Sequence, residues 1–147
     1  YHRNKSDCHS KVHEKMNEKR YKKYEMILEE FKDDLVEYIG PADATCGILC
    51  WGSTRGVVTE VIENLNANGY KIKALVPKVI SPVPEVPLKN FISSLKKTLV
   101  IEMSYSKQFY HYLKSYVGLP EDAKLYKRSG GAPFTVEEIR NVIKEAF

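Results

Sequence analysis

A short apolar run, followed at once by a glycine turn and a helical pattern, constrains this chain most. The run Gly47-Ile48-Leu49-Cys50-Trp51 is typical of a strand that is buried on both faces. It breaks at Gly52-Ser53-Thr54, and from Val57 onward the apolar residues recur at helical spacing. Gly52 allows a sharp reversal, and a side-chain oxygen of Ser53 or Thr54 can cap the new helix. The sequence therefore predicts a strand, a tight turn and a helix here.

The start of this predicted helix is a candidate binding site. Its free backbone N–H groups and the positive end of its dipole point out of the sheet edge, beside Arg55. We therefore name Gly52, Ser53, Thr54 and Arg55 as candidates for contact with an anionic or polar ligand, or with a partner. The turn lacks the Gly-Lys-Ser/Thr of a phosphate-binding loop and the G-x-G-x-x-G of a dinucleotide fold. A plain capped turn without a ligand is an equally good interpretation.

The N-terminal region predicts one long charged helix. We expect a polar tail over residues 1–9 and a helix from about Ser10 to Ile39, ended by Gly40-Pro41. Lysines and arginine crowd its first half and acids follow, which is typical of a solvated face. The first half has so few apolar residues that we expect it to lie against a partner surface or to be loosely held. Nucleic-acid binding is the minor alternative, since no aromatic stacking platform accompanies the charge.

The remaining residues alternate between strand and helix patterns. We expect strands near 46–51, 71–79, 98–103 and 124–127, and helices near 54–68, 88–95, 109–116 and from Thr135 onward. Thr135 and Glu138 form a capping box, and the last strand is weak enough to be an edge strand. This order predicts a three-layer α/β/α sandwich with a mostly parallel sheet of four to five strands. Residues 1–40 would form the tail and helix, and residues 41–147 the α/β domain.

Three loops are expected at the carboxyl edge of that sheet, where open α/β folds bind their ligands. They comprise residues 52–55, 80–87 and 102–108. Glu102 ends an apolar strand, and Ser104 and Gln108 lie close enough in sequence to bond to it or to a ligand. We favour a structural role in which Glu102 accepts N–H groups from the next helix. Because no G-x-S-x-G or H-E-x-x-H motif is present, we predict no catalytic residue.

Composition excludes several classes of protein. Three cysteines in 147 residues indicate no disulfide framework and favour a reducing compartment, so we expect a cytoplasmic protein. No apolar run approaches the roughly 20 residues that span a membrane. Cys8, His9 and His13 lack a convincing fourth ligand, so we predict no metal site. The chain begins without Met or a signal peptide, and we expect it to be part of a longer one.

Five short segments together resemble the C-terminal part of the alpha subunit of 2-oxoacid:ferredoxin oxidoreductases. The segments follow one another at compatible spacing: Glu18-Lys19-Arg20 with Lys23, Trp51-Gly52-Ser53-Thr54-Arg55-Gly56, Ser81-Pro82-Val83-Pro84, Glu102 through Gln108, and Gly131-Ala132-Pro133-Phe134 with Glu138. They are similar to the family's basic helix, W-G-S-T turn, P-x-P loop, E-x-N-x-x-G-Q segment and G-R-P-F-x-x-x-E ending. The chain departs from the family at Ser104 (Asn), Lys107 (Gly) and Ala132 (Arg).

The resemblance implies a transketolase C-terminal-like domain, in which one strand can run antiparallel. It also implies an enzyme that oxidatively decarboxylates a 2-oxoacid to an acyl-CoA, with thiamine diphosphate, Mg and an iron–sulfur cluster as cofactors and ferredoxin as electron acceptor. Those cofactors belong to other domains and to the beta subunit, so this chain would be an assembly or interface domain, inactive alone. The alternative is a stand-alone anion- or nucleotide-binding module that uses the turn from Gly52 to Arg55.

Overall fold

The computed structural model describes residues 5–147, with side chains from Ser10 onward, and has five helices and five strands in that range. In chain order these are α1 (Lys5–Glu30), β1 (Val36–Ile39), β2 (Cys46–Leu49), α2 (Thr54–Ala67), β3 (Ile72–Pro77), α3 (Glu85–Ser93), β4 (Lys97–Glu102), α4 (Gln108–Tyr116), β5 (Lys124–Lys127) and α5 (Val136–Ala146). The strands form one sheet of order β1-β3-β2-β4-β5. All neighbouring strands are parallel except β1, which runs antiparallel to β3.

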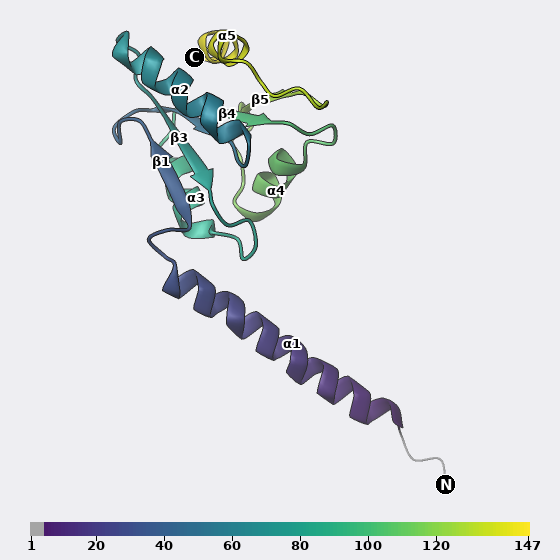
Figure 1. Cartoon of the computed structure of the whole chain (residues 1–147). Coiled ribbons are helices and arrows are strands. Elements are labelled where there is room, and N and C mark those ends of the chain that lie inside the picture. The colour runs from purple at the N-terminus through teal and green to yellow at the C-terminus, as the bar shows by residue number, and fades with distance from the viewer. Residues whose placement is uncertain (1–4) are drawn as a thin grey trace.

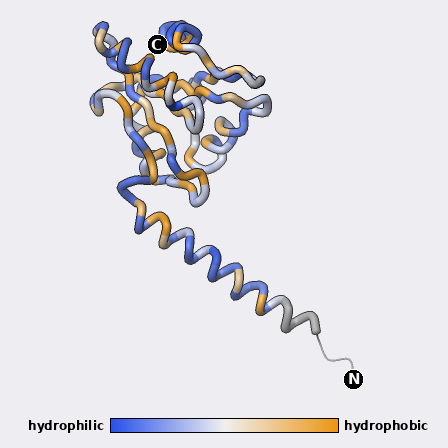
Figure 2. The backbone as a smooth tube through the Cα atoms, in the orientation of Figure 1, coloured by the Kyte–Doolittle hydropathy of each residue, from blue (hydrophilic) through white to orange (hydrophobic). Residues whose placement is uncertain are grey.

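The sheet is covered by helices on both faces, which confirms the predicted three-layer α/β architecture (Figure 1). Helices α2 and α5 pack on one face, where Ile48, Val61, Ala74 and Ile139 belong to one fully buried cluster. Helices α3 and α4 pack on the other face over a second cluster that includes Leu75. In Figure 2 the hydrophobic residues follow the strands, as expected for strands buried on both faces.

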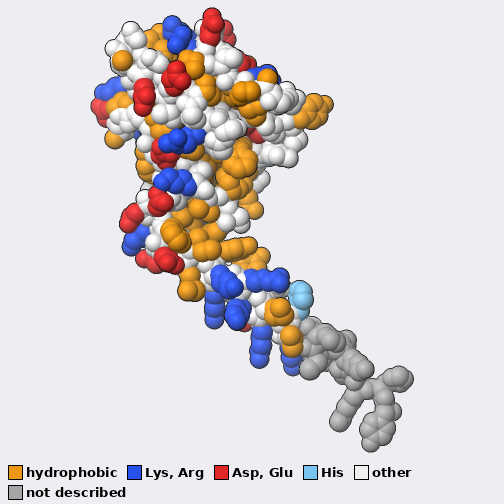
Figure 3. Space-filling view, in the orientation of Figure 1, with side chains coloured by type: hydrophobic (Ala, Val, Ile, Leu, Met, Phe, Trp, Pro, Cys, Tyr) orange, Lys and Arg blue, Asp and Glu red, His pale blue; other side chains and the backbone are white. Residues whose placement is uncertain are grey.

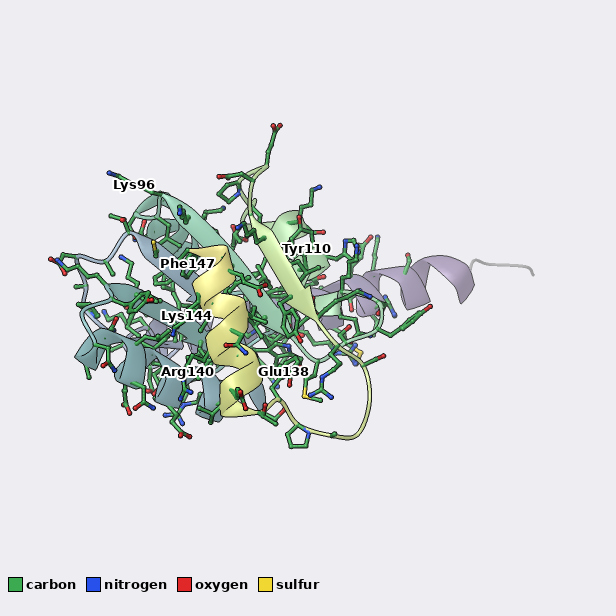
Figure 4. The ribbon with its side chains drawn as sticks, turned by 90° about the horizontal axis from the view of Figure 1, so that it is seen from above. Lys96, Tyr110, Glu138, Arg140, Lys144 and Phe147 are labelled. Atoms are coloured by element: carbon green, nitrogen blue, oxygen red, sulfur yellow. The ribbon has the colours of Figure 1, made fainter. Side chains whose placement is uncertain are left out.

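Local signals placed the C-terminal helix correctly. The Thr135 hydroxyl accepts a hydrogen bond from the Glu138 N–H, and the Glu138 carboxylate accepts one from the Thr135 N–H, so the predicted capping box is present. Glu138 also accepts bonds from the Tyr126 hydroxyl and the Arg128 guanidinium. Figure 4 looks down on α5, with Glu138 near its start and Phe147 at its end. The contacts of Glu138 tie this helix to the edge strand β5.

The N-terminal helix differs from the prediction at both ends. It begins at Lys5, so part of the expected polar tail is helical, and residues 1–4 lie outside the described part. It ends at Glu30, and the range that we predicted as its last part contains β1 instead. The expected helix through Ile39 is therefore wrong, because residues 36–39 pair with β3 and gain a full ladder of sheet hydrogen bonds. Gly40-Pro41 ends a strand rather than a helix.

Helix α1 extends away from the α/β domain, with only its C-terminal end beside it (Figure 1). Leu28 from this end lines a groove with Val83, Pro84 and Val86 of the loop before α3. Farther along, large apolar side chains are exposed on the helix, among them Met16 and Tyr24. None of the helices in the described residues is long and apolar enough to cross a membrane.

Candidate functional site at the carboxyl edge of the sheet

The three loops predicted to gather at the carboxyl edge do lie together. The ring of Trp51, after β2, lies 6.2 Å from the ring of Phe109 at the start of α4. The Tyr112 hydroxyl of α4 donates a 2.8 Å hydrogen bond to the Ile80 carbonyl, after β3. Burial raises the pKa of this phenol to about 12, so Tyr112 stays a hydrogen-bond donor at neutral pH. The loops after three parallel strands therefore form one connected edge.

The turn between β2 and α2 is built by its backbone. Gly52 has a positive φ of 61°, and its carbonyl accepts the Arg55 N–H at 3.1 Å. Ser53 is the N-cap residue but has helical dihedrals and makes no side-chain cap bond, so the first of the two predicted caps, by the Ser53 hydroxyl, is wrong. Thr54 is buried at the first turn of α2. Gly52, Ser53 and Arg55 are exposed, which leaves the helix start open to solvent.

Arg55 does not project freely into that opening. Its Nε and Nη2 atoms each donate a 2.6 Å hydrogen bond to the carboxylate of Glu37, on β1. The bidentate geometry is the strongest that an arginine and a carboxylate adopt. The hydrogen bond from Arg55 lowers the pKa of Glu37 and raises the pKa of Arg55. The one strong positive charge at the turn is therefore already paired within the chain.

Removing the arginine should expose this coupling. In Arg55→Met we expect the pKa of Glu37 to rise toward its ordinary value of 4.5, because the donated hydrogen bonds are the largest cause of the shift. A carboxyl group whose pKa is lower in the folded than in the unfolded state stabilises the fold at pH values above its unfolded-state pKa. That stability is lost as the pH falls through the folded-state pKa. Both side chains are partly exposed, so solvent screens the pair and its contribution to the stability of the fold is small.

A carboxyl ¹³C NMR titration measures this shift directly. Lys71→Met, which removes the partner of Asp43, is the matched control and should leave the Glu37 titration unchanged. An unshifted Glu37 in Arg55→Met would contradict the described pairing.

Glu102 is a buried structural acid, as its favoured interpretation predicted. Its side chain is 1% exposed at the end of β4. One carboxylate oxygen accepts the Phe109 N–H and the other the Tyr110 N–H, each at 3.0 Å. These are first-turn donors of α4, which have no partner within the helix. The carboxylate thus caps α4 and holds it against the sheet, and is not free to act on a ligand.

Ser104 and Gln108 contribute to the same turn. The Ser104 hydroxyl accepts the Gln108 N–H at 3.1 Å, which gives α4 a third capping bond. Between them, Lys107 has a left-handed backbone with φ 57° and ψ 43°. The family that this chain resembles has glycine at this position. The positive φ explains the glycine, because a side chain raises the energy of a left-handed backbone conformation.

Lys107→Gly should therefore stabilise the fold. Relief of the left-handed strain is offset in part by the greater freedom of glycine in the unfolded chain. We expect a net gain of about 0.5–1 kcal/mol in the free energy of unfolding, measured by urea denaturation. Lys114→Gly, inside the same helix, is the control and should instead destabilise by about 1 kcal/mol. A loss of stability in Lys107→Gly would refute the strain.

An open cleft of about 640 Å³ lies at this edge and is lined by Glu37, Trp51, Gly52, Arg55, Lys78 and Ile80. Its charged side chains are matched inside the chain, since Lys78 pairs with Asp34. Beside it, burial raises the pKa of the Cys50 thiol to about 12, so Cys50 is no nucleophile at neutral pH. No cluster of three or more possible metal ligands occurs among the side chains described. The cleft therefore provides an open concave surface with the exposed indole of Trp51, and its charged side chains are already paired.

Comparison with known proteins identifies a matching family and several similar proteins. Residues 44–139 match the family described as pyruvate:ferredoxin oxidoreductase core domain II. The 2-oxoacid:ferredoxin oxidoreductase subunit alpha of Saccharolobus solfataricus is 27% identical over 136 residues, which is 92% of this chain and 21% of the relative. The alpha subunit of 2-oxoacid:ferredoxin oxidoreductase 1 from Sulfurisphaera tokodaii is 26% identical over 129 residues, which is 87% of this chain and 20% of the relative.

A solved structure agrees with these sequence matches. The 2-oxoglutarate:ferredoxin oxidoreductase from Magnetococcus marinus, solved with 2-oxoglutarate, coenzyme A and succinyl-CoA bound, superimposes with a TM-score of 0.80. The two are 36% identical, and the match covers 91% of this chain and 23% of that one. The chain thus spans about a fifth of the length of these relatives. It is similar to one domain of the 2-oxoacid:ferredoxin oxidoreductase alpha subunits, and it belongs to the pyruvate:ferredoxin oxidoreductase core domain II family.

Proposed function

We propose that this chain is an assembly domain, which contributes contact surface rather than reacting groups to its enzyme. The enzyme would oxidatively decarboxylate a 2-oxoacid in the cytoplasm, form an acyl-CoA and reduce ferredoxin. The partners would be the beta subunit and the remaining alpha-chain domains. In this division the helical region ahead of β1 connects the α/β domain to its neighbours.

The observation that carries the proposal is the exposed apolar surface of α1. A helix in water owes most of its stability to packing of one face, and this one leaves Met16, Tyr24, Met26 and Phe31 between 42% and 64% exposed at its side and end. Figure 3 shows hydrophobic side chains along the surface of this helix, and Lys and Arg side chains gathered toward its N-terminal half. Exposed apolar residues bordered by charge are typical of a protein interface.

The chemistry of the described residues also favours assembly. Thiamine diphosphate binds through Mg²⁺, which needs clustered oxygen ligands, and an iron–sulfur cluster needs about four thiolates. The described side chains include two free cysteines, of which Cys50 is fully buried, and no ligand cluster. These residues do not fit either cofactor, so no reaction step is assigned to them. Arg55 and Glu102 are likewise engaged by Glu37 and by α4.

Affinity capture with the tagged chain tests this proposal. From a lysate of the source organism, we expect the wild type to retain a beta subunit that binds thiamine diphosphate, identified by mass spectrometry. Met16→Ser combined with Tyr24→Ser should weaken that capture, whereas Tyr70→Ser, an exposed aromatic outside α1, should not. Calorimetry should detect no binding of thiamine diphosphate by the chain alone. Tight binding there, or failure to capture any oxidoreductase subunit, would overturn the assembly role.

The open helix start after Gly52 keeps a second candidate function testable. A stand-alone module for anions or nucleotides would use Gly52, Ser53, Thr54 and Arg55 at the cleft. A thermal-shift screen of phosphorylated compounds, coenzyme A included, separates the two functions. Stabilisation of the wild type that is lost in Arg55→Ala would favour the ligand module, and no stabilisation by any compound would leave assembly as the function.

A further inference from the structure

A buried lysine occupies the opposite end of the sheet from the carboxyl-edge cleft. Lys73 is the second residue of β3, near the amino end of that strand, and is only 7% exposed. Lysine is among the residues least often buried, because an ammonium loses its hydration on burial unless other groups replace it. The groups around Lys73 therefore decide what this position does.

The protein supplies only neutral partners to this ammonium. Its Nζ donates one 2.9 Å bond to the Ala42 carbonyl and another to the Ser94 hydroxyl, and it lies 5.4 Å from the centre of the Phe91 ring. An ammonium has three N–H donors, so one remains without an acceptor among the described residues. The nearby Asp43 carboxylate is exposed and pairs with Lys71.

The helix that ends beside Lys73 compensates only part of its charge. Ser94 is the C-cap of α3, and a helix C-terminus carries about half a negative charge at most. No ion pair to Lys73 is formed within the described part of the chain, whereas Lys71 and Lys78, which flank the same strand, each pair with a carboxylate. A full positive charge in a water-poor environment is thus incompletely matched.

A cavity of about 290 Å³ opens in front of this charge, between the β1–β3 edge and α3. It is lined by Tyr38, Gly40, Lys73, Asn90, Phe91 and Ser94. The rings of Tyr38 and Phe91 form an aromatic pair with centroids 6.3 Å apart. The side-chain amide of Asn90 has no hydrogen-bond partner in the described structure. Apolar walls with a few convergent donors are the ordinary make-up of a small-molecule site.

We propose that this cavity binds a small organic carboxylate, whose charged end accepts the third N–H of Lys73 and whose apolar body lies against Tyr38 and Phe91. A single ammonium matches one negative charge, so a monocarboxylate fits better than a doubly charged phosphate. The volume accommodates a molecule of about the size of one aromatic ring. The site lies at the amino end of β3 and does not depend on the assembly role proposed above.

An NMR titration of the ¹⁵N-labelled chain with benzoate tests the proposal, with uncharged benzamide as the matched compound. We expect saturable shifts of the Asn90 side-chain amide and the Gly40 N–H with benzoate, and at least about tenfold weaker binding of benzamide. Lys73→Met keeps the length of the side chain and removes the charge, and should weaken benzoate binding at least about tenfold (about 1.4 kcal/mol). Lys71→Met, which alters an exposed ion pair, should bind as the wild type does.

Two results would overturn the proposal. One is the absence of saturable shifts up to millimolar benzoate. This holds even if an acidic peptide, titrated separately, does bind at the cavity. The other is equal affinity in Lys73→Met and the wild type, which would show that binding does not use the ammonium. Should Lys73→Met fail to fold, Asn90→Ala changes an exposed side chain of the same cavity and is expected to weaken benzoate binding severalfold. The second result is then judged on Asn90→Ala, and unchanged benzoate affinity in that variant would contradict the site.

Discussion

Replacing Glu102 by alanine should lower the free energy of unfolding by about 3–5 kcal/mol. The carboxylate is 1% exposed and accepts both the Phe109 and Tyr110 N–H groups, so its removal leaves two buried donors without a partner and creates a small cavity. The loss reaches beyond α4, because Phe109 belongs to the core cluster on that face of the sheet. This is the largest effect that we expect from any single carboxylate in the domain.

Equilibrium urea unfolding, followed by circular dichroism, measures this loss. Glu102→Gln should cost less, about 1–3 kcal/mol, since its amide oxygen still accepts one bond while the charge assistance is lost. Glu121→Ala removes an exposed acid on the loop before β5 and should change stability by less than about 0.5 kcal/mol. If Glu102→Ala unfolds within that same narrow range, the capping role assigned to the buried carboxylate is wrong.

The parts of this fold that the sequence predicts are those with a strong local signal. The capping box at Thr135 and Glu138 marks the start of α5, and the weak apolar pattern from Lys124 to Lys127 marks an edge strand. The role of Glu102 also follows from sequence, because a carboxylate at the end of an apolar strand lies close to the next helix start. In each case the determining residues are close together in the chain.

Strand β1 shows where local signals are insufficient. Leu35 and Tyr38 continue the apolar spacing of α1, so the helical pattern runs on past the end of the helix. The strand is four residues long, and its partner β3 lies more than 30 residues later, so the pairing that selects it is not local. The sequence did contain a signal for this strand. Strands are favoured by Val36, Tyr38 and Ile39, and a helix is disfavoured by Asp33-Asp34.

The missed strand also concealed the main electrostatic feature of the candidate site. Glu37 comes from β1 and pairs with Arg55, 18 residues away. Without the strand, Arg55 was expected beside an open helix start; with it, the guanidinium is held by a carboxylate. Lys73 is similar, since its burial depends on the end of α3, on Ala42 and on the sheet together. Contacts between elements decide both sites, and residue spacing does not encode them.

The turn that ends β1 gives the second large expected effect. Gly40 has a φ of +83°, and a Cβ added there would overlap the Ile72 carbonyl oxygen and lie 3.2 Å from the Lys73 Cα. Both contacts are backbone atoms of β3, so relief requires β1 to move away from the strand with which it pairs. We expect Gly40→Ala to lower the free energy of unfolding by about 3–4 kcal/mol, the sum of left-handed strain and steric overlap.

Gly69→Ala separates those two contributions. Gly69 has nearly the same dihedral, a φ of +87°, but a Cβ there meets no atom within 4 Å. Its replacement should therefore cost only the conformational strain, about 1 kcal/mol, and lower the melting temperature by roughly 2–6 °C. The difference between the two variants in urea unfolding then measures the overlap with β3. Equal losses of stability in the two variants would mean that β1 can move away from β3 without a measurable loss of free energy, and is not held firmly in the sheet. A much larger loss in Gly40→Ala would show that this short strand, which also carries the partner of Arg55, is an integral part of the domain.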